Sequence, residues 1–295
     1  MKSITHPPHR VPAIACAVLA LGTFAGTALA QTATTVNPYA GSVVVKKFYD
    51  ANANGVRDTG EPFLTGWPMT LTLPGGATST KNSTATWSGL TGGSGYSVLE
   101  ATPLQSNWVQ TAPRVGGVPV NPKNVTVVPC KTVTVYFGNY CKKGSGGHTL
   151  GYWSNKNGQD RMNDGGELAT ELGLLASLNL VGATGAAFDP LNYDAFRAWL
   201  LGGNSVNMAY MLSVQLAAMT LNVETGFVDG DAYFLPCKCT LNELMDDANA
   251  SLGLYPNTPS GHAQRDEQAT LKNWLDQLNN GASIVPATPC TRTFY

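Results

Sequence analysis

The sequence predicts an all-β sandwich followed by a small all-α domain, and two observations carry this prediction. Between residues 41 and 139, short apolar runs alternate with polar residues and are separated by Gly- and Pro-rich turns, which is typical of strands. From Leu168 onward, apolar residues recur at three- and four-residue intervals, which is the spacing of amphipathic helices. A length of 295 residues is enough for two domains.

The first predicted domain, residues 41–141, contains a series of short candidate strands. They are Val43–Phe48, Met69–Leu73, Tyr96–Glu100, Asn107–Gln110, Val125–Val128 and Thr132–Phe137. The turn sequence Pro74-Gly75-Gly76 follows the second of them. Strands at roughly 8–12-residue spacing with such turns favour a sandwich.

Residues 142–147 (KKGSGG) are predicted to be a flexible linker, because Gly and Ser restrain the backbone little. The second predicted domain, residues 148–295, is α-helical. Its apolar helix faces are Leu168/Leu172/Leu175, Phe196/Trp199/Leu200, Leu241/Leu244/Met245/Ala248/Leu252 and Leu271/Trp274/Leu275/Leu278. Thr240 and Glu243 form a capping box before the third of these. Met208–Val223 is apolar on nearly all sides, which predicts a central buried helix.

Residues 1–30 have the pattern of a secretory signal peptide. Lys2 and Arg10 precede the apolar run Val11–Leu21, and Ala28-Leu29-Ala30 forms a small-residue cleavage site. Cys16 lies inside the apolar run and not after it, so lipid attachment is not expected. We therefore expect a secreted protein, either extracellular or on the cell surface.

Charge and hydropathy argue against two classes of partner. The chain has 18 Lys and Arg against 19 Asp and Glu, a net charge of −1, which disfavours a basic nucleic-acid binder. The most apolar later stretch, Met208–Val223, is interrupted by Ser213, Gln215 and Thr220. We expect no nucleic-acid partner and no membrane span.

Residues 50–61 (DANANGVRDTGE) match the twelve-residue calcium loop position by position. The predicted Ca²⁺ ligands are Asp50, Asn52, Asn54, Val56 through its carbonyl, Asp58 and Glu61. Gly55 stands at the sixth position, where the sharp turn requires glycine. The alternative is an Asx-rich turn that binds no ion. The predicted strands on both sides indicate a structural clip of modest affinity and not a helix-opening sensor.

The segment Lys46–Leu73 (KKFYDANANGVRDTGEPFLTGWPMTLTL) resembles the SD-repeat B-like domains of bacterial surface proteins. Trp87–Leu90, Gly95–Glu100 and Val133–Asn139 are similar to later strands of the same prealbumin-like family. This resemblance covers about 100 residues. It implies an immunoglobulin/prealbumin-like sandwich that binds calcium and acts as a stalk or adhesive module without catalysis.

His148–Asn155 (HTLGYWSN) is similar to a "GYW" segment of exported bacterial proteins, with Ser154 in place of the usual Lys. No chemistry is established for that module, so this resemblance implies no function for the helical domain.

Relatives of the sandwich form an intramolecular Lys–Asn isopeptide bond that a buried acid promotes. The resemblance implies the same chemistry for Lys46 or Lys47 with Asn139, and Glu100 would be the acid. Strand alternation would place Lys46 inward if Phe48 points inward. The alternative is an exposed lysine pair, an edge glutamate and a turn asparagine.

Five cysteines remain after residue 30, and an oxidising compartment favours disulfides among them. Cys130 and Cys141 cannot pair with each other if one extended strand separates them. Cys141 is expected to tie the two domains together through Cys237, Cys239 or Cys290, which the sequence leaves open. An odd number leaves one thiol free or paired with another chain.

The sequence therefore favours an exported, calcium-stabilised, structural or adhesive surface module with no catalytic residues. Its partners would be calcium and a host or matrix protein or a glycan. A carbohydrate-binding module is one alternative, and it needs Trp67, Trp87 and Trp108 in an exposed row. A hydrolase is another, and it needs His148 and His262 together in the helical domain with nearby acids.

Overall fold

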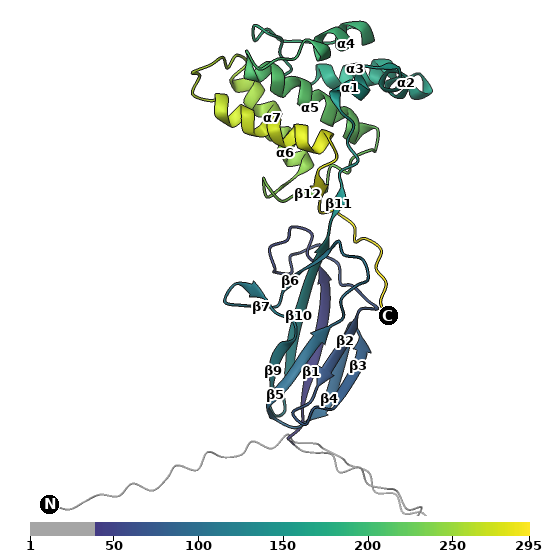
Figure 1. Ribbon diagram of the computed structural model, residues 1–295, viewed down its shortest axis with the longest axis vertical. Helices are drawn as coiled ribbons and strands as arrows, with labels where there is room; N and C mark the ends of the chain where they lie inside the picture. Colours follow the sequence, from purple (N-terminus) through teal and green to yellow (C-terminus); the bar gives the residue numbers. More distant parts are fainter. Residues whose placement is uncertain (1–38) are drawn as a thin grey trace, which may run out of the picture.

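The computed structural model describes residues 39–295, so the predicted signal peptide lies outside the described part of the chain. Figure 1 shows the β-sheets at one end of an elongated molecule and the helices at the other. The chain crosses to the helices through β11, and its C-terminal tail runs back to end beside the sheets.

Two four-stranded sheets make up the β part of the molecule. The first has the order β4 (Ala85–Leu90), β1 (Gly41–Tyr49), β10 (Thr132–Cys141), β6 (Trp108–Ala112). The second has the order β3 (Thr78–Asn82), β2 (Pro68–Thr72), β5 (Gly93–Glu100), β9 (Lys123–Val127). The central strands β1 and β10 run parallel, while their other neighbours are antiparallel. A separate hairpin joins β7 (Arg114–Val115) to β8 (Val118–Pro119).

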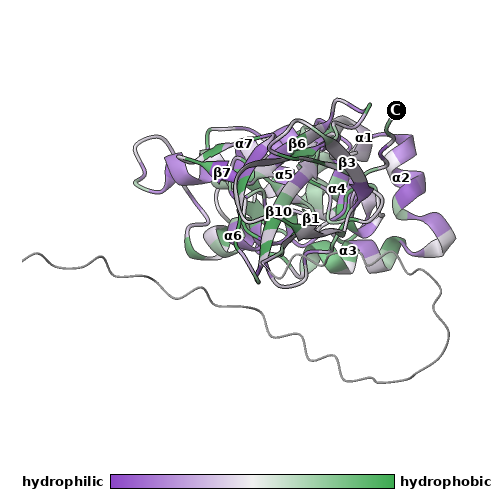
Figure 2. Ribbon diagram, turned by 90° about the horizontal axis from the view of Figure 1, so that it is seen from below, coloured by the Kyte–Doolittle hydropathy of each residue, from purple (hydrophilic) through white to green (hydrophobic). Residues whose placement is uncertain are grey.

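The two sheets share one apolar core. Inward-facing residues of both sheets belong to it, among them Val45, Leu71, Val98 and Phe137. Seen along the long axis, β10 carries hydrophobic residues through the middle of the molecule (Figure 2). Each predicted strand overlaps an observed one. β3 was missed because its sequence, TSTKN, has no apolar residue to reveal an alternation.

The helical part is built round one buried helix, as the sequence predicts. Its helices are α1 (Leu150–Trp153), α2 (Lys156–Met162), α3 (Leu168–Ala176), α4 (Tyr193–Leu201), α5 (Met208–Glu224), α6 (Leu241–Leu254) and α7 (Arg265–Asn279), with a 3₁₀ turn at Asp164–Gly166. α5 is buried on most sides and packs against α6 and α7. The predicted capping box of Thr240 and Glu243 is present at the start of α6. No helix among residues 39–295 is long and apolar enough to cross a membrane.

The segment that joins the two parts is ordered by pairing. β11 (Lys143–Gly144) pairs with β14 (Ser283–Ile284), and the buried Ser145 hydroxyl donates to the Leu278 carbonyl over 2.6 Å. Composition predicts a flexible linker at 142–147, and in the structure residues 143–145 of this segment form hydrogen bonds with the later part of the chain. Their partners come more than 130 residues later in the chain, so local sequence could not reveal them.

The C-terminal tail leaves the helices and returns to the sheets. The Tyr49 hydroxyl donates to the Pro286 carbonyl over 2.7 Å, and Cys290 forms a disulfide with Cys141 at the end of β10. Of the three candidates Cys237, Cys239 and Cys290, Cys290 is therefore the partner of Cys141. A second disulfide joins Cys237 and Cys239, beside the hairpin of β12 (Tyr233–Phe234) and β13 (Cys239–Thr240).

Candidate functional site

The β core contains a lysine whose side chain has no contact with solvent. Lys47 faces inward with Val43 and Val45, and it is 0% exposed. Phe48 lies on the opposite face, where its ring fills the space a side chain at position 138 would need. The expectation that Lys46 faces inward is thus wrong. Its ammonium lies against the rings of Phe63 and Tyr136, at 5.4 and 5.8 Å from their centroids.

Lys47 meets Asn139 because of the parallel register of β1 and β10. Lys47 lies opposite Phe137, so Asn139, two residues further on, faces the same side. The Lys47 Nζ donates to Asn139 Oδ1 over 2.5 Å. Asn139 is only 3% exposed. Two strands that are 92 residues apart in the chain therefore place an amine against an amide inside the core.

The facing sheet supplies a carboxyl to the same point. Glu100, at the end of β5, is 4% exposed, and its Oε2 lies 3.1 Å from Lys47 Nζ. Glu100 also forms a side-chain hydrogen bond with Asn139. The Asn121 side chain fixes the backbone of Glu100, since it accepts from the Glu100 N–H and donates to its carbonyl, each over 2.9 Å.

Burial moves both ionisable groups toward their neutral forms. It lowers the pKa of Lys47 to about 8, although the neighbouring Glu100 acts in the opposite direction. Burial likewise raises the pKa of Glu100, against the effect of Lys47. One proton shared by this pair can reside on the carboxyl and leave the amine neutral and nucleophilic.

The three side chains have the arrangement needed for an intramolecular amide transfer. Neutral Lys47 Nζ would attack Asn139 Cγ and form a new N–C bond, while the protonated Glu100 gives its proton to Asn139 Nδ2. The Cγ–Nδ2 bond would then break and release one ammonia, and the Glu100 carboxylate would take up the proton that Nζ loses. No oxidant or cofactor enters this balance.

The predicted calcium loop lies between strands and is closed by its own hydrogen bonds. Asp50 Oδ1 and Oδ2 accept from the N–H groups of Asn54 and Gly55 over 3.0 and 2.8 Å. The amides of Asn52 and Asn54 both donate to Asp58 Oδ2, over 2.8 and 2.6 Å. Gly55 has a φ of +81°, so the turn at the sixth position requires glycine as expected.

The loop fits a metal ion only in part. Three of the predicted ligand side chains, Asn52, Asn54 and Asp58, meet through hydrogen bonds, while the Asp50 carboxylate accepts from backbone N–H groups of the same loop. Glu61 instead accepts from the N–H groups of Ala51 and Asp58, over 2.8 and 3.0 Å. Within residues 39–295, no three His, Cys, Asp or Glu side chains are grouped closely enough to hold a metal. The predicted ligands thus share one loop, and calcium binding stays a prediction.

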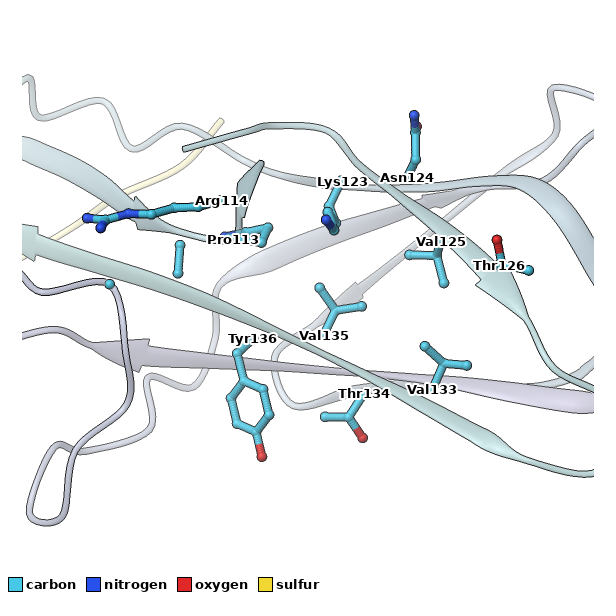
Figure 3. Close-up of a pocket in the computed structure, with 12 residues that line it drawn as sticks. Pro113, Arg114, Lys123, Asn124, Val125, Thr126, Val133, Thr134, Val135 and Tyr136 are labelled. Atoms are coloured by element: carbon cyan, nitrogen blue, oxygen red, sulfur yellow. The ribbon is translucent and has the colours of Figure 1, made fainter. Parts of the chain in front are cut away.

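The tryptophans proposed for carbohydrate binding do not form an exposed row. Trp67 and Trp87 are 0% and 5% exposed, and Trp108 is half-buried with its indole donating to Thr291. A different feature is a groove of about 420 Å³ between β9 and β10. Figure 3 shows the side chains that line it. Five of its twelve lining residues are valine or threonine, and Tyr136 is its one aromatic residue.

The two histidines proposed for a hydrolase have separate surroundings. His148 stacks on Tyr152, with ring centroids 3.9 Å apart, and meets Phe227 edge-on. His262 lies before α7, where its Nδ1 accepts from the Gln264 N–H over 3.1 Å. Neither has an acid as its hydrogen-bond partner in these contacts, so they give no support to a catalytic pair.

Comparison with known proteins gives little further guidance. No protein-family model and no curated protein matches the chain. One similar solved structure is GBS52, the minor pilin of Streptococcus agalactiae, with 20% identity and a TM-score of 0.24, covering 34% of this chain and 44% of that one. Another is the Bacillus anthracis TIE protein, with 18% identity and a TM-score of 0.25, covering 36% and 17%. This chain therefore spans less than half the length of either structure.

Proposed function

We propose that the chain is an exported structural module of the bacterial cell surface, in which Lys47 and Asn139 are joined by an isopeptide bond. The observation that carries the proposal is the fully buried contact of Lys47, Asn139 and Glu100 between two sheets. A buried ion pair rarely stabilises a fold more than apolar residues would. The Asn139 amide beside this pair would allow Lys47 and Glu100 to carry out the amide transfer described above.

The cross-link would act in series with a disulfide. Asn139 lies two residues before Cys141, which is bonded to Cys290 in the tail. A covalent route would then run from β1 through Lys47 to Asn139, on to Cys141, and across to Cys290. Load applied between β1 and the tail would bypass most of both sheets and the whole helical part. This is the behaviour expected of a stalk or adhesive module.

Calcium would have a local role beside this route. Asp50 follows β1 directly, so an ion held by Asp50, Asn52, Asn54, Val56, Asp58 and Glu61 would stiffen the connection from β1 to β2. Such a module would bind a host or matrix protein or a glycan. The helical part, which is held at both ends, would make this contact.

Intact-mass measurement of oxidised residues 31–295 tests the cross-link. The proposal expects a mass lower than the sequence mass by one ammonia after disulfides are counted. It also expects one branched peptide that joins β1 to β10 after digestion. Full mass in the wild-type protein would refute the proposal.

Matched variants identify the bond. Lys47→Met and Asn139→Ala should each have the full mass of their own sequence, whereas Lys46→Met should lose one ammonia like the wild type. Gln31 would be the N-terminal residue, and cyclisation of glutamine also releases ammonia. An ammonia loss in Asn139→Ala would therefore be assigned to Gln31. The cross-link predicts that the wild type loses one ammonia more than Asn139→Ala, and equal losses in the two proteins would count against it.

A further inference from the structure

The wall that separates the Lys47 amine from solvent is built partly by the C-terminal tail. The Trp67 ring lies 4.4 Å from Lys47 Nζ, measured to the ring centroid, and Trp67 is fully buried. The half-buried guanidinium of Arg292 lies 5.5 Å from the same ring centroid. The Phe294 ring meets Trp67 edge-on at 5.1 Å. Two tail residues therefore cover the aromatic ring that covers the amine.

Several contacts hold the tail in this place. Arg292 donates to the Thr65 carbonyl over 2.7 Å. The Gln105 side-chain amide donates to the Thr293 hydroxyl over 2.8 Å and accepts from the Thr293 backbone N–H over 2.9 Å. The Cys141–Cys290 disulfide fixes the start of the tail two residues from Asn139. The tail reaches this position only after the chain has passed through the entire helical part.

Arg292 also acts on the amine electrostatically. Its positive charge lowers the pKa of Lys47, in the same direction as burial, while Glu100 and Asp50 act in the opposite direction. The Arg292 Nε is buried without a hydrogen-bond partner. A cation near the amine favours its neutral, nucleophilic form.

We propose that the tail residues Arg292 and Phe294, held by the Cys141–Cys290 disulfide, complete the cross-linking site, so that the Lys47–Asn139 bond forms only after the tail has docked. This inference rests on the proposed function. Arg292 is a positioning residue, because it acts on Lys47 through Trp67 and through its charge. Bond formation would then follow the folding of the helical part and lock a finished molecule.

The test follows ammonia release over time in residues 31–295. The protein is recovered unfolded from a reducing cytoplasm and refolded with an oxidant in buffers from about pH 6 to 9, a range that spans the pKa of Lys47. Arg292→Gln removes the charge, Arg292→Lys keeps it, and Cys141→Ser/Cys290→Ser removes the tether. Arg161→Gln is the matched control, since Arg161 lies 5.3 Å from the Phe227 ring in the helical part.

We expect Arg292→Gln to slow ammonia release and to move the midpoint of its pH profile upward, because it removes a cation that favours the neutral amine. Arg292→Lys should restore the midpoint, and the disulfide variant should cross-link slowly. Arg161→Gln should match the wild type. If the wild type cross-links and the Arg292 and disulfide variants do so at the same rate and midpoint, the tail proposal is wrong and the proposed function stands.

Two other outcomes would also be decisive. Slower release in Arg292→Gln with an unchanged midpoint, not improved by Arg292→Lys, would overturn the positioning role of Arg292. A wild-type protein that never releases ammonia would overturn the proposed function itself.

Discussion

The contact between the two sheets and the contact between α5 and α7 bury different kinds of polar side chain. Between the sheets lie an amine and a carboxyl, Lys47 and Glu100, at 0% and 4% exposure. Between α5 and α7 the buried groups are neutral amides. Asn279 donates to the Gln215 side chain over 2.8 Å, and Asn222 donates to Asn279 over 2.9 Å.

The amides and the ionisable pair differ in the desolvation cost of burying them. The amides satisfy one another and bind the backbone at Gln215 and His148, so they fix α5 against α7 at little desolvation cost. The amine and carboxyl each lose favourable hydration, and their attraction offsets this only in part. The amide network therefore holds the two helices together, whereas the ionisable pair is the basis of the reaction proposed above.

Mechanical unfolding should show the largest effect of the covalent bonds in the β part. With handles at residues 39 and 295, the oxidised protein should release no long segment under load. Reduction of Cys141–Cys290, which are separated by 149 residues, should add roughly 500 Å of chain. Asn139→Ala should add roughly 300 Å from the 92 residues after Lys47. Single-molecule extension measures both, and identical traces for wild type and Asn139→Ala would contradict the covalent route.

Loss of the cross-link should also lower the equilibrium stability. Closing a loop of 92 residues restricts the unfolded chain, so Asn139→Ala should reduce the free energy of unfolding by about 4–5 kcal/mol. Urea denaturation with the disulfides intact gives this value. Asn124→Ala, at an exposed asparagine of β9, is the control and should change it little.

Disrupting the amide network should cost less than losing the cross-link. Asn279→Leu leaves the Gln215 and Asn222 side chains without their partner, so we expect a loss of about 2–3 kcal/mol in the free energy of unfolding. Asn273→Leu, at an exposed position of the same helix, should have little effect. Equal losses for the two variants would show that the network does not stabilise the helical part.

A pH series isolates the buried amine. Folding lowers the pKa of Lys47 from 10.5 to about 8, so the unfolded chain binds more protons between these values and stability must rise with pH there. In an Asn139→Ala background, stability should increase by about 2 kcal/mol from pH 8 to pH 10 relative to Lys47→Met/Asn139→Ala. Parallel curves for the two proteins would mean that Lys47 titrates normally.

Calcium removal should have the smallest effect. An ion of modest affinity adds about 1 kcal/mol to the free energy of unfolding at millimolar concentration. Thermal melts with calcium and with a chelator measure it, and Glu61→Gln should abolish the difference. Coincident melts of the wild type, with no bound metal by elemental analysis, would leave the loop as a hydrogen-bonded turn.

Local patterns located many elements of the fold, whereas the members of the candidate site came from a resemblance. Alternation located β1, β2, β5 and β10, and the apolar stripe with its cap located α6. The resemblance supplied Asn139, Glu100 and a lysine as a set but did not decide between Lys46 and Lys47. It was the register of β1 and the packing of Phe48 on its outer face that selected Lys47.

The sequence by itself determined the period of each segment and the turn-forming loop of Asp50 to Glu61, because each depends on neighbours a few positions away. Tertiary structure decided which lysine is buried, which cysteine pairs with Cys141, and where Arg292 rests. Those outcomes join positions about 90 to more than 220 residues apart. Chain-distant contacts leave no periodic signal, since only the packing of complete sheets against the returning tail brings them together.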